Sequence, residues 1–143
     1  MRLGRLSIAQ RIEAVAIIVV VVAAFLTWAD SPDLIMTGVQ GDGIITLFVA
    51  NTSLIVLLMS SGVVGTRSGK GKVAPFVLLG FAAFVVFIPV LNLTEFSQIG
   101  LHLTLGAGIV WLLAAAWQAF RTFWTTPLSL QSLRTLHGPT GQD

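Results

Sequence analysis

One histidine of this sequence stands inside an apolar segment, where histidine can bind a cofactor. His102 lies about one helical turn into a segment that begins near residue 99. Its imidazole can ligate a haem or a chlorophyll-type pigment, or take up a proton, with Asp42 or Glu95 as a partner. The other histidine, His137, lies in the polar tail and offers no second axial ligand. We expect His102 to be a hydrogen-bonded interface residue, with pigment or haem binding as the alternative.

Four carboxylates lie in the two polar connections that we expect on the outer side of a membrane. Asp30, Asp33 and Asp42 belong to the first connection and Glu95 to the second. Carboxylate oxygens are the ligands that calcium prefers, so an outer calcium site is conceivable. Helix capping is the simpler use, because a carboxylate before a helix accepts hydrogen bonds from its free amides. We therefore predict that Asp42 caps the second helix and that there is no metal site.

Polar side chains within the apolar segments are few. Asn51, followed by Thr52 and Ser53, lies about 8–10 residues into the second segment, or about 12–15 Å from its start. We expect Asn51 to make an interhelical hydrogen bond worth about 0.6–2 kcal/mol, with substrate or ion binding at the bilayer midplane as the alternative. Glu13 follows Arg11 at the expected inner edge of the first segment. We predict no site there.

Several classes of activity have no support in the sequence. The chain contains no cysteine, which excludes disulfides, thiolate metal sites and thiol redox chemistry. The glycine-rich stretch at residues 65–71 lacks the Gly-x-x-x-x-Gly-Lys-Ser/Thr spacing of a phosphate loop. The apolar segments contain no acid–base pair of the kind that catalysis needs. We expect a protein that is not an enzyme and does not bind nucleic acid.

The composition indicates an integral membrane protein. Hydrophobic residues make up 55% of the 143 residues and charged residues only 10%, whereas a soluble domain has about 25% charged residues. Apolar runs of about 20 residues cross a bilayer as helices. The sequence therefore predicts an all-α fold, an up-down bundle of four transmembrane helices between a basic amphipathic segment at residues 1–11 and an interfacial tail at residues 121–143. The predicted helices are residues 12–29, 44–64, 73–93 and 99–120.

Charges of opposite sign fall on opposite sides of this arrangement. All eight Lys and Arg residues fall on the side of the termini, whereas the four carboxylates of the connections fall on the other. Because cytoplasmic loops carry the excess of Lys and Arg, both termini are predicted to be cytoplasmic, in a bacterial inner membrane. The basic residues are Arg2, Arg5, Arg11, Arg67, Lys70, Lys72, Arg121 and Arg134.

Small residues recur every four positions on the fourth predicted helix. Gly100, Thr104 and Gly108 would form a ridge on one helix face. Such ridges let two helices approach closely in lipid, where packing holds them together. We predict that this ridge makes the closest helix–helix contact of the protein, either within the chain or with another subunit.

Three short motifs resemble those of a group of small, uncharacterised four-helix membrane proteins of actinobacteria. These proteins share a tryptophan that closes helix one, a Gly-Asp-Gly turn before helix two and a glycine-rich helix four. The resemblance covers most of residues 12–120 and implies a fold without an activity. The motifs in this chain are Trp28, the turn Gly41-Asp42-Gly43 and the run Gly106-x-Gly108-x-x-Trp111.

The absence of chemistry-bearing clusters determines the functional expectation. We predict a non-catalytic accessory or assembly subunit of a larger membrane complex, with the lipid bilayer and other integral membrane subunits as its partners. Transport usually requires buried ionisable groups or broken helices near the midplane. A small homo-oligomeric transporter or channel that uses Asn51 is the alternative, and a pigment- or haem-binding subunit that uses His102 comes third.

Overall fold

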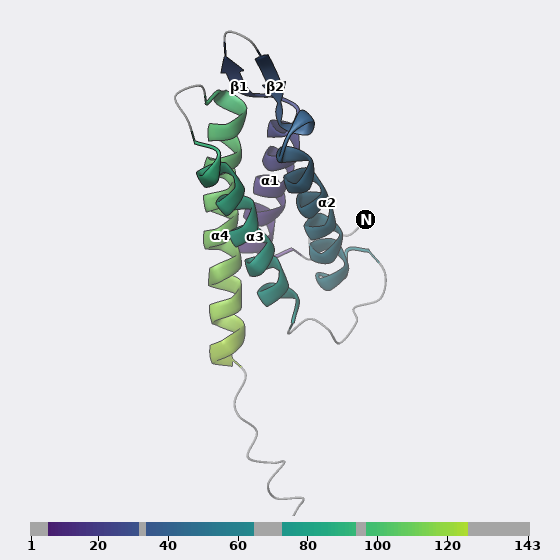
Figure 1. The fold of residues 1–143 in the computed structure, drawn as a ribbon. Helices are drawn as coiled ribbons and strands as arrows, with labels where there is room; N and C mark the ends of the chain where they lie inside the picture. Colours follow the sequence, from purple (N-terminus) through teal and green to yellow (C-terminus); the bar gives the residue numbers. More distant parts are fainter. Residues whose placement is uncertain (1–5, 32–33, 65–72, 94–96, 126–143) are drawn as a thin grey trace, which may run out of the picture.

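Four α-helices and one β-hairpin make up the part of the chain that the computed structural model describes, residues 6–31, 34–64, 73–93 and 97–125 (Figure 1). The elements are α1 (Ile8–Ala23), β1 (Thr27–Ser31), β2 (Leu34–Thr37), the 3-10 helix η2 (Gly38–Gln40), α2 (Gly43–Ser60), α3 (Ala74–Leu91) and α4 (Ile99–Thr125). In the bundle, α1 and α3 each pack against both α2 and α4. The hairpin stands at one end. The predicted helical fold with four helices is confirmed.

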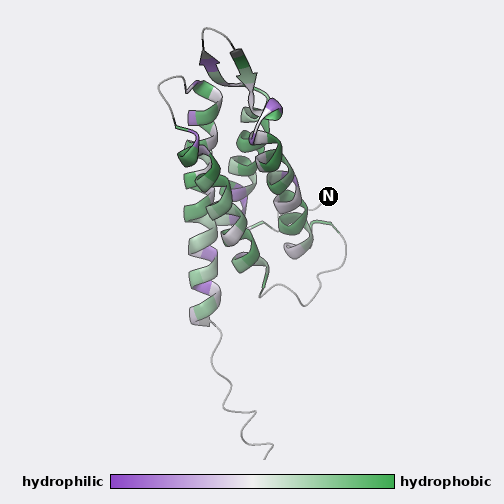
Figure 2. Ribbon diagram, viewed as in Figure 1, coloured by the Kyte–Doolittle hydropathy of each residue, from purple (hydrophilic) through white to green (hydrophobic). Residues whose placement is uncertain are grey.

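Three of the helices, α2, α3 and α4, are long and apolar enough to cross a membrane. Hydrophobic residues make up most of the helical ribbon (Figure 2). Large apolar side chains of these helices are exposed, among them Phe48, Phe84 and Leu113. Such extensive apolar surface is unfavourable in water. It suits contact with lipid.

The first helix is displaced from its predicted position at residues 12–29. Ser7 starts it one turn early, because its Oγ accepts a hydrogen bond from Gln10 N at 3.3 Å while Gln10 Oε1 accepts one from Ser7 N at 2.9 Å. This reciprocal capping box satisfies two free amides. The helix ends at Ala23, where the chain turns toward the hairpin. Its 16 residues span about 24 Å.

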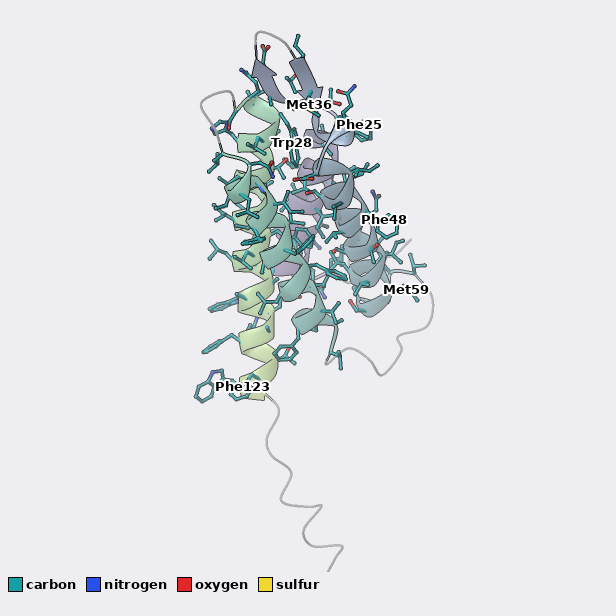
Figure 3. All side chains as sticks on the ribbon, in the orientation of Figure 1. Phe25, Trp28, Met36, Phe48, Met59 and Phe123 are labelled. Atoms are coloured by element: carbon teal, nitrogen blue, oxygen red, sulfur yellow. The ribbon has the colours of Figure 1, made fainter. Side chains whose placement is uncertain are left out.

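The hairpin replaces the polar loop predicted after the first helix. β1 and β2 pair in antiparallel register, with Asp30 opposite Ile35. Trp28, predicted to close the helix, lies instead in β1, where its buried indole Nε1–H donates to Ala23 O at 3.0 Å (Figure 3). Gln98 N donates to Trp28 O at 2.9 Å and attaches the start of α4 to this strand. These two hydrogen bonds attach β1 to the end of α1 and to the start of α4, at one end of the bundle.

The Gly-Asp-Gly turn holds the start of α2 against η2. A Cβ on Gly43 would lie 2.5 Å from Gly38 O, so only glycine fits, whereas Gly41 has room for a side chain. Asp42 occupies the N-cap position but makes no side-chain capping bond, and that prediction is wrong. Its backbone has helical angles, unlike the extended N-cap that presents an oxygen to the helix amides. Instead, Asp42 Oδ2 accepts a hydrogen bond from Asn92 Nδ2 at 3.3 Å.

The ends of α2 and α4 also differ from their predicted positions. α2 ends at Ser60, short of residue 64, because Gly62 adopts a left-handed conformation with φ 71°. α4 continues past residue 120 to Thr125 and is the longest of the four helices at 27 residues. Its last turns extend beyond the other helices (Figure 1). The tail predicted to lie at the membrane surface falls mostly outside the described residues.

Apart from the buried Glu13 of α1, the described charged residues near the bundle ends separate by sign. Arg11 lies in the first turn of α1 and Arg121 in the last turns of α4. Asp30 and Asp42 lie at the opposite end, in β1 and at the start of α2. The bundle therefore has a basic end and an acidic end, which carries the hairpin.

Candidate functional site

The bundle encloses the carboxyl group of Glu13, in the second turn of α1. The side chain is 0% exposed. Trp111 Nε1 donates a hydrogen bond to Oε1 at 3.0 Å, and Gln118 Nε2 donates one to Oε2. Each carboxyl oxygen therefore has its own donor from α4.

The geometry of two antiparallel helices brings these side chains together. The first turns of α1 lie beside the last turns of α4, and residues seven apart on a helix are about two turns apart. Trp111 and Gln118 thus face the same side. Between them, Ala114 and Ala115 are buried and small, so α1 can approach α4 closely.

Hydrogen bonds offset the free-energy cost of burying the Glu13 carboxyl group. Taking a carboxylate out of water costs several kcal/mol unless its oxygens are paired. The two donors to Glu13 that the structure describes are neutral, so hydrogen bonds solvate the group. Sliding α1 along α4 would break both bonds. The network therefore fixes the register of the two helices.

A small polar pocket adjoins this network at the basic end. It encloses about 300 Å³ and is lined in part by Ser7, Gln118, Arg121 and Thr122. Gln118 thus lies between the pocket and the enclosed carboxyl of Glu13. The pocket has room for water next to the network.

Glu13 has no predicted role in the sequence, because the neighbouring Arg11 places it at the inner edge of the membrane. The sequence signal for its burial is the helical spacing of the residues that follow it. Glu13, Ile17 and Val20 follow one another at spacings of four and three, and all three are buried. An acid on that stripe faces the bundle whatever its depth in the membrane.

Asn51 lies at the middle of α2, as the ninth of its 18 residues, and its side chain is exposed. Asn51 Nδ2 donates to Leu47 O of the same helix at 2.9 Å. Its Oδ1 and its second N–H make no hydrogen bond to the part of the chain that the structure describes. An amide with spare hydrogen-bonding capacity therefore faces outward from an apolar helix.

Hydroxyl groups elsewhere in the helices bond to their own backbone. Ser53 Oγ donates to Val49 O at 2.7 Å, and Thr104 Oγ1 donates to Gly100 O at 2.8 Å. Such bonds to the carbonyl four residues earlier satisfy a hydroxyl without another helix. Among the buried side-chain atoms that the structure describes, Thr46 Oγ1 lacks a partner.

His102 is exposed in the first turn of α4. Its Nδ1 lies 2.9 Å from Gln98 O, one turn earlier. The predicted partner Glu95 lies outside the described residues, as does Asp33. Within the described ranges no three His, Cys, Asp or Glu side chains gather as a metal site would require. Binding of haem or pigment by His102 stays a prediction.

The small-residue ridge of α4 faces the interior. Gly100, Thr104 and Gly108 are all buried. A Cβ on Gly100 would lie 2.7 Å from Thr27 O, and a Cβ on Gly108 would lie 3.1 Å from Val86 Cγ2 of α3. The ridge thus contacts β1 at one end and α3 further along.

The fold and its polar network define a helical bundle with three helices able to cross a membrane and a hydrogen-bonded carboxyl between its first and last helices. Comparisons with protein-family models, curated proteins and solved structures found no match. The predicted resemblance to small actinobacterial membrane proteins stays a prediction.

Proposed function

We propose that this protein is a non-catalytic accessory or assembly subunit of a larger membrane complex. It resides in a bacterial cytoplasmic membrane, with four membrane crossings and both termini in the cytoplasm. The observation that carries the proposal is the outward-facing amide of Asn51 in the middle of α2.

The charge separation supports the orientation. Arg11 and Arg121 define one end of the bundle, and the positive-inside rule assigns that end to the cytoplasm. In this arrangement α1 crosses the membrane as well as α2, α3 and α4, although its 16 residues are few for a hydrocarbon core of about 30 Å. The long side chain of Arg11 lets its guanidinium group reach the membrane interface while the backbone lies within the hydrocarbon. At the opposite end of α1 the hairpin extends the chain beyond the helix.

The exposed amide of Asn51 favours contact with a helix of another subunit. Lipid chains offer no hydrogen-bond partner, so an amide that faces them keeps groups unsatisfied. A second transmembrane helix can supply a donor or an acceptor and remove this cost. Phe48, labelled in Figure 3, and Ile55 are three and four residues from Asn51 and therefore share its helix face. Both are exposed, so they can pack against such a helix. The outward face of α2 is thus the proposed contact with another subunit.

Replacing Asn51 by leucine should release the partner. An interhelical hydrogen bond worth about 0.6–2 kcal/mol corresponds to roughly 3- to 30-fold weaker association. After purification from its native membrane in mild detergent, native mass measurement should show the protein bound to a larger, different subunit. Asn51→Leu should lower the bound fraction, and Asn51→Gln, which keeps an amide, should retain more of it.

Phe84→Leu is the matched control, because Phe84 is exposed and belongs to α3 and not to α2. It should leave the association unchanged. A native mass that corresponds to a monomer or a homodimer contradicts the subunit proposal and favours the homo-oligomeric transporter. Full retention of the partner by Asn51→Leu shows that α2 is not the contact.

A further inference from the structure

A groove runs along the seam between α1 and α4 on the outside of the bundle. One part encloses about 540 Å³ between apolar walls that include Val19, Leu103 and Gly106. The next part encloses about 570 Å³. Ile12 and Val110 line both parts, so the two are continuous. The groove lies on a different helix pair from the Asn51 face.

The polar groups of the groove are concentrated at the basic end of the bundle. Arg11 lines the first part, and Arg121 lines the second together with Ser7 and Trp117. These four side chains belong to the start of α1 and the end of α4, which lie at the same end. Toward the hairpin the walls are apolar as far as His102.

We propose that this groove binds one anionic phospholipid. Its phosphate lies near Arg11 and Arg121, and an acyl chain follows the apolar seam toward the hairpin. Guanidinium groups recognise phosphate through paired hydrogen bonds. Basic pockets between transmembrane helices at the cytoplasmic side hold anionic headgroups, and tryptophan side chains such as Trp117 favour the interface. The inference depends on membrane embedding but not on a protein partner at α2.

The groove is longer than one leaflet. From His102 to Arg121, which line its two parts, α4 rises about 29 Å, and one leaflet contributes about 15 Å, half of a hydrocarbon core of about 30 Å. The two arginines lie near one end of this length, where the headgroup of the cytoplasmic leaflet would be. The position of the charges thus indicates the occupant.

Native mass spectrometry of the purified full chain tests the proposal. The protein is equilibrated in mixed micelles with phosphatidylglycerol and phosphatidylcholine of identical acyl chains. We expect one phosphatidylglycerol to be retained with a preference of roughly 30-fold, the ratio expected for two arginines near an anionic headgroup. Glycerol 3-phosphate, which has the phosphate without acyl chains, should not displace it.

Variants examine the two halves of the groove separately. Arg11→Gln combined with Arg121→Gln should lower phosphatidylglycerol retention to the level of phosphatidylcholine. Gly106→Phe should fill the apolar part and exclude either lipid, because a Cβ at Gly106 meets no atom within 4 Å. Gly80→Phe on α3 is the control, since Gly80 is equally open and lies outside the groove lining. Circular dichroism and thermal midpoints show that each variant is folded.

Three results would overturn the proposal. One is equal retention of the two phospholipids by the wild-type chain. Another is unchanged phosphatidylglycerol binding in both the arginine double variant and Gly106→Phe. The third is a polypeptide cross-linked to the groove from Gly106 in native membranes. None of these depends on whether Asn51 holds a partner subunit, so the two proposals fail separately.

Discussion

Trp111→Ala should destabilise the protein more than any other single truncation, by about 5 kcal/mol. Removal of a fully buried tryptophan costs about 3–5 kcal/mol through lost burial and the cavity left behind. A further penalty of about 1–3 kcal/mol arises because Glu13 Oε1 loses its donor while it stays enclosed. Chemical unfolding in detergent, followed by circular dichroism, measures the loss.

A double-mutant cycle separates the hydrogen bond from the packing. Trp111→Phe keeps an aromatic ring but removes the N–H, so it should cost about 1–3 kcal/mol when Glu13 is present. With Glu13→Leu in the background the same change should cost much less, because the carboxyl that needs a donor is gone. Trp117→Phe is the control: Trp117 is 57% exposed, and its replacement should be close to neutral. Equal costs in the two backgrounds would show that the indole contributes packing alone.

Three glycines of α4 should respond to alanine in a fixed order, with Gly100 the most sensitive. A Cβ at Gly100 would meet the backbone atom Thr27 O at 2.7 Å, so the strand or the helix must shift, at a cost of about 3 kcal/mol or more. At Gly108 the nearest atom is Val86 Cγ2 at 3.1 Å, a side chain that can adjust, and we expect a loss of about 1 kcal/mol or less. Gly106→Ala meets no atom and should gain up to about 1 kcal/mol from helix propensity.

Thermal midpoints of the three alanine variants in one detergent give this order directly. Gly108→Leu should behave differently from Gly108→Ala, because the longer side chain cannot fit against α3 and should separate the helices. Native stability of Gly108→Leu would mean that the ridge contributes little to packing. A Gly106→Ala variant that is less stable than Gly100→Ala would contradict the helix placement itself.

The helices could be predicted because run length and charge are local properties of the sequence. α3 departs by only one or two residues from the expected 73–93, since Pro75 marks its first turn and apolar residues fill the rest. The hairpin could not be predicted in this way. Trp28 continues an apolar run in sequence, and its place in β1 depends on the pairing with β2 and on the contacts of its indole with Ala23 and of its carbonyl with Gln98.

The polar network illustrates the other limit. Glu13 and Trp111 are 98 residues apart in the chain, and their hydrogen bond depends on which helices become neighbours. The charge distribution in the sequence places Arg11 at the edge of the membrane. Glu13, two residues later, is then expected at the same edge and not inside the bundle. Asn51 shows the converse, because its mid-helix position is visible in the sequence while its outward direction depends on the packing of α2.

Single-cysteine labelling tests the membrane arrangement most directly, because the chain has no cysteine of its own. Cysteines at Gly4, Ser68 and Asp30 avoid the basic residues that determine orientation. With α1 as a true crossing, a membrane-impermeant maleimide added to spheroplasts should label Asp30→Cys and leave Gly4→Cys and Ser68→Cys unmodified until the cells are lysed. Labelling of Gly4→Cys and Asp30→Cys from the same side would show that α1 does not cross, and the four-crossing account would be wrong.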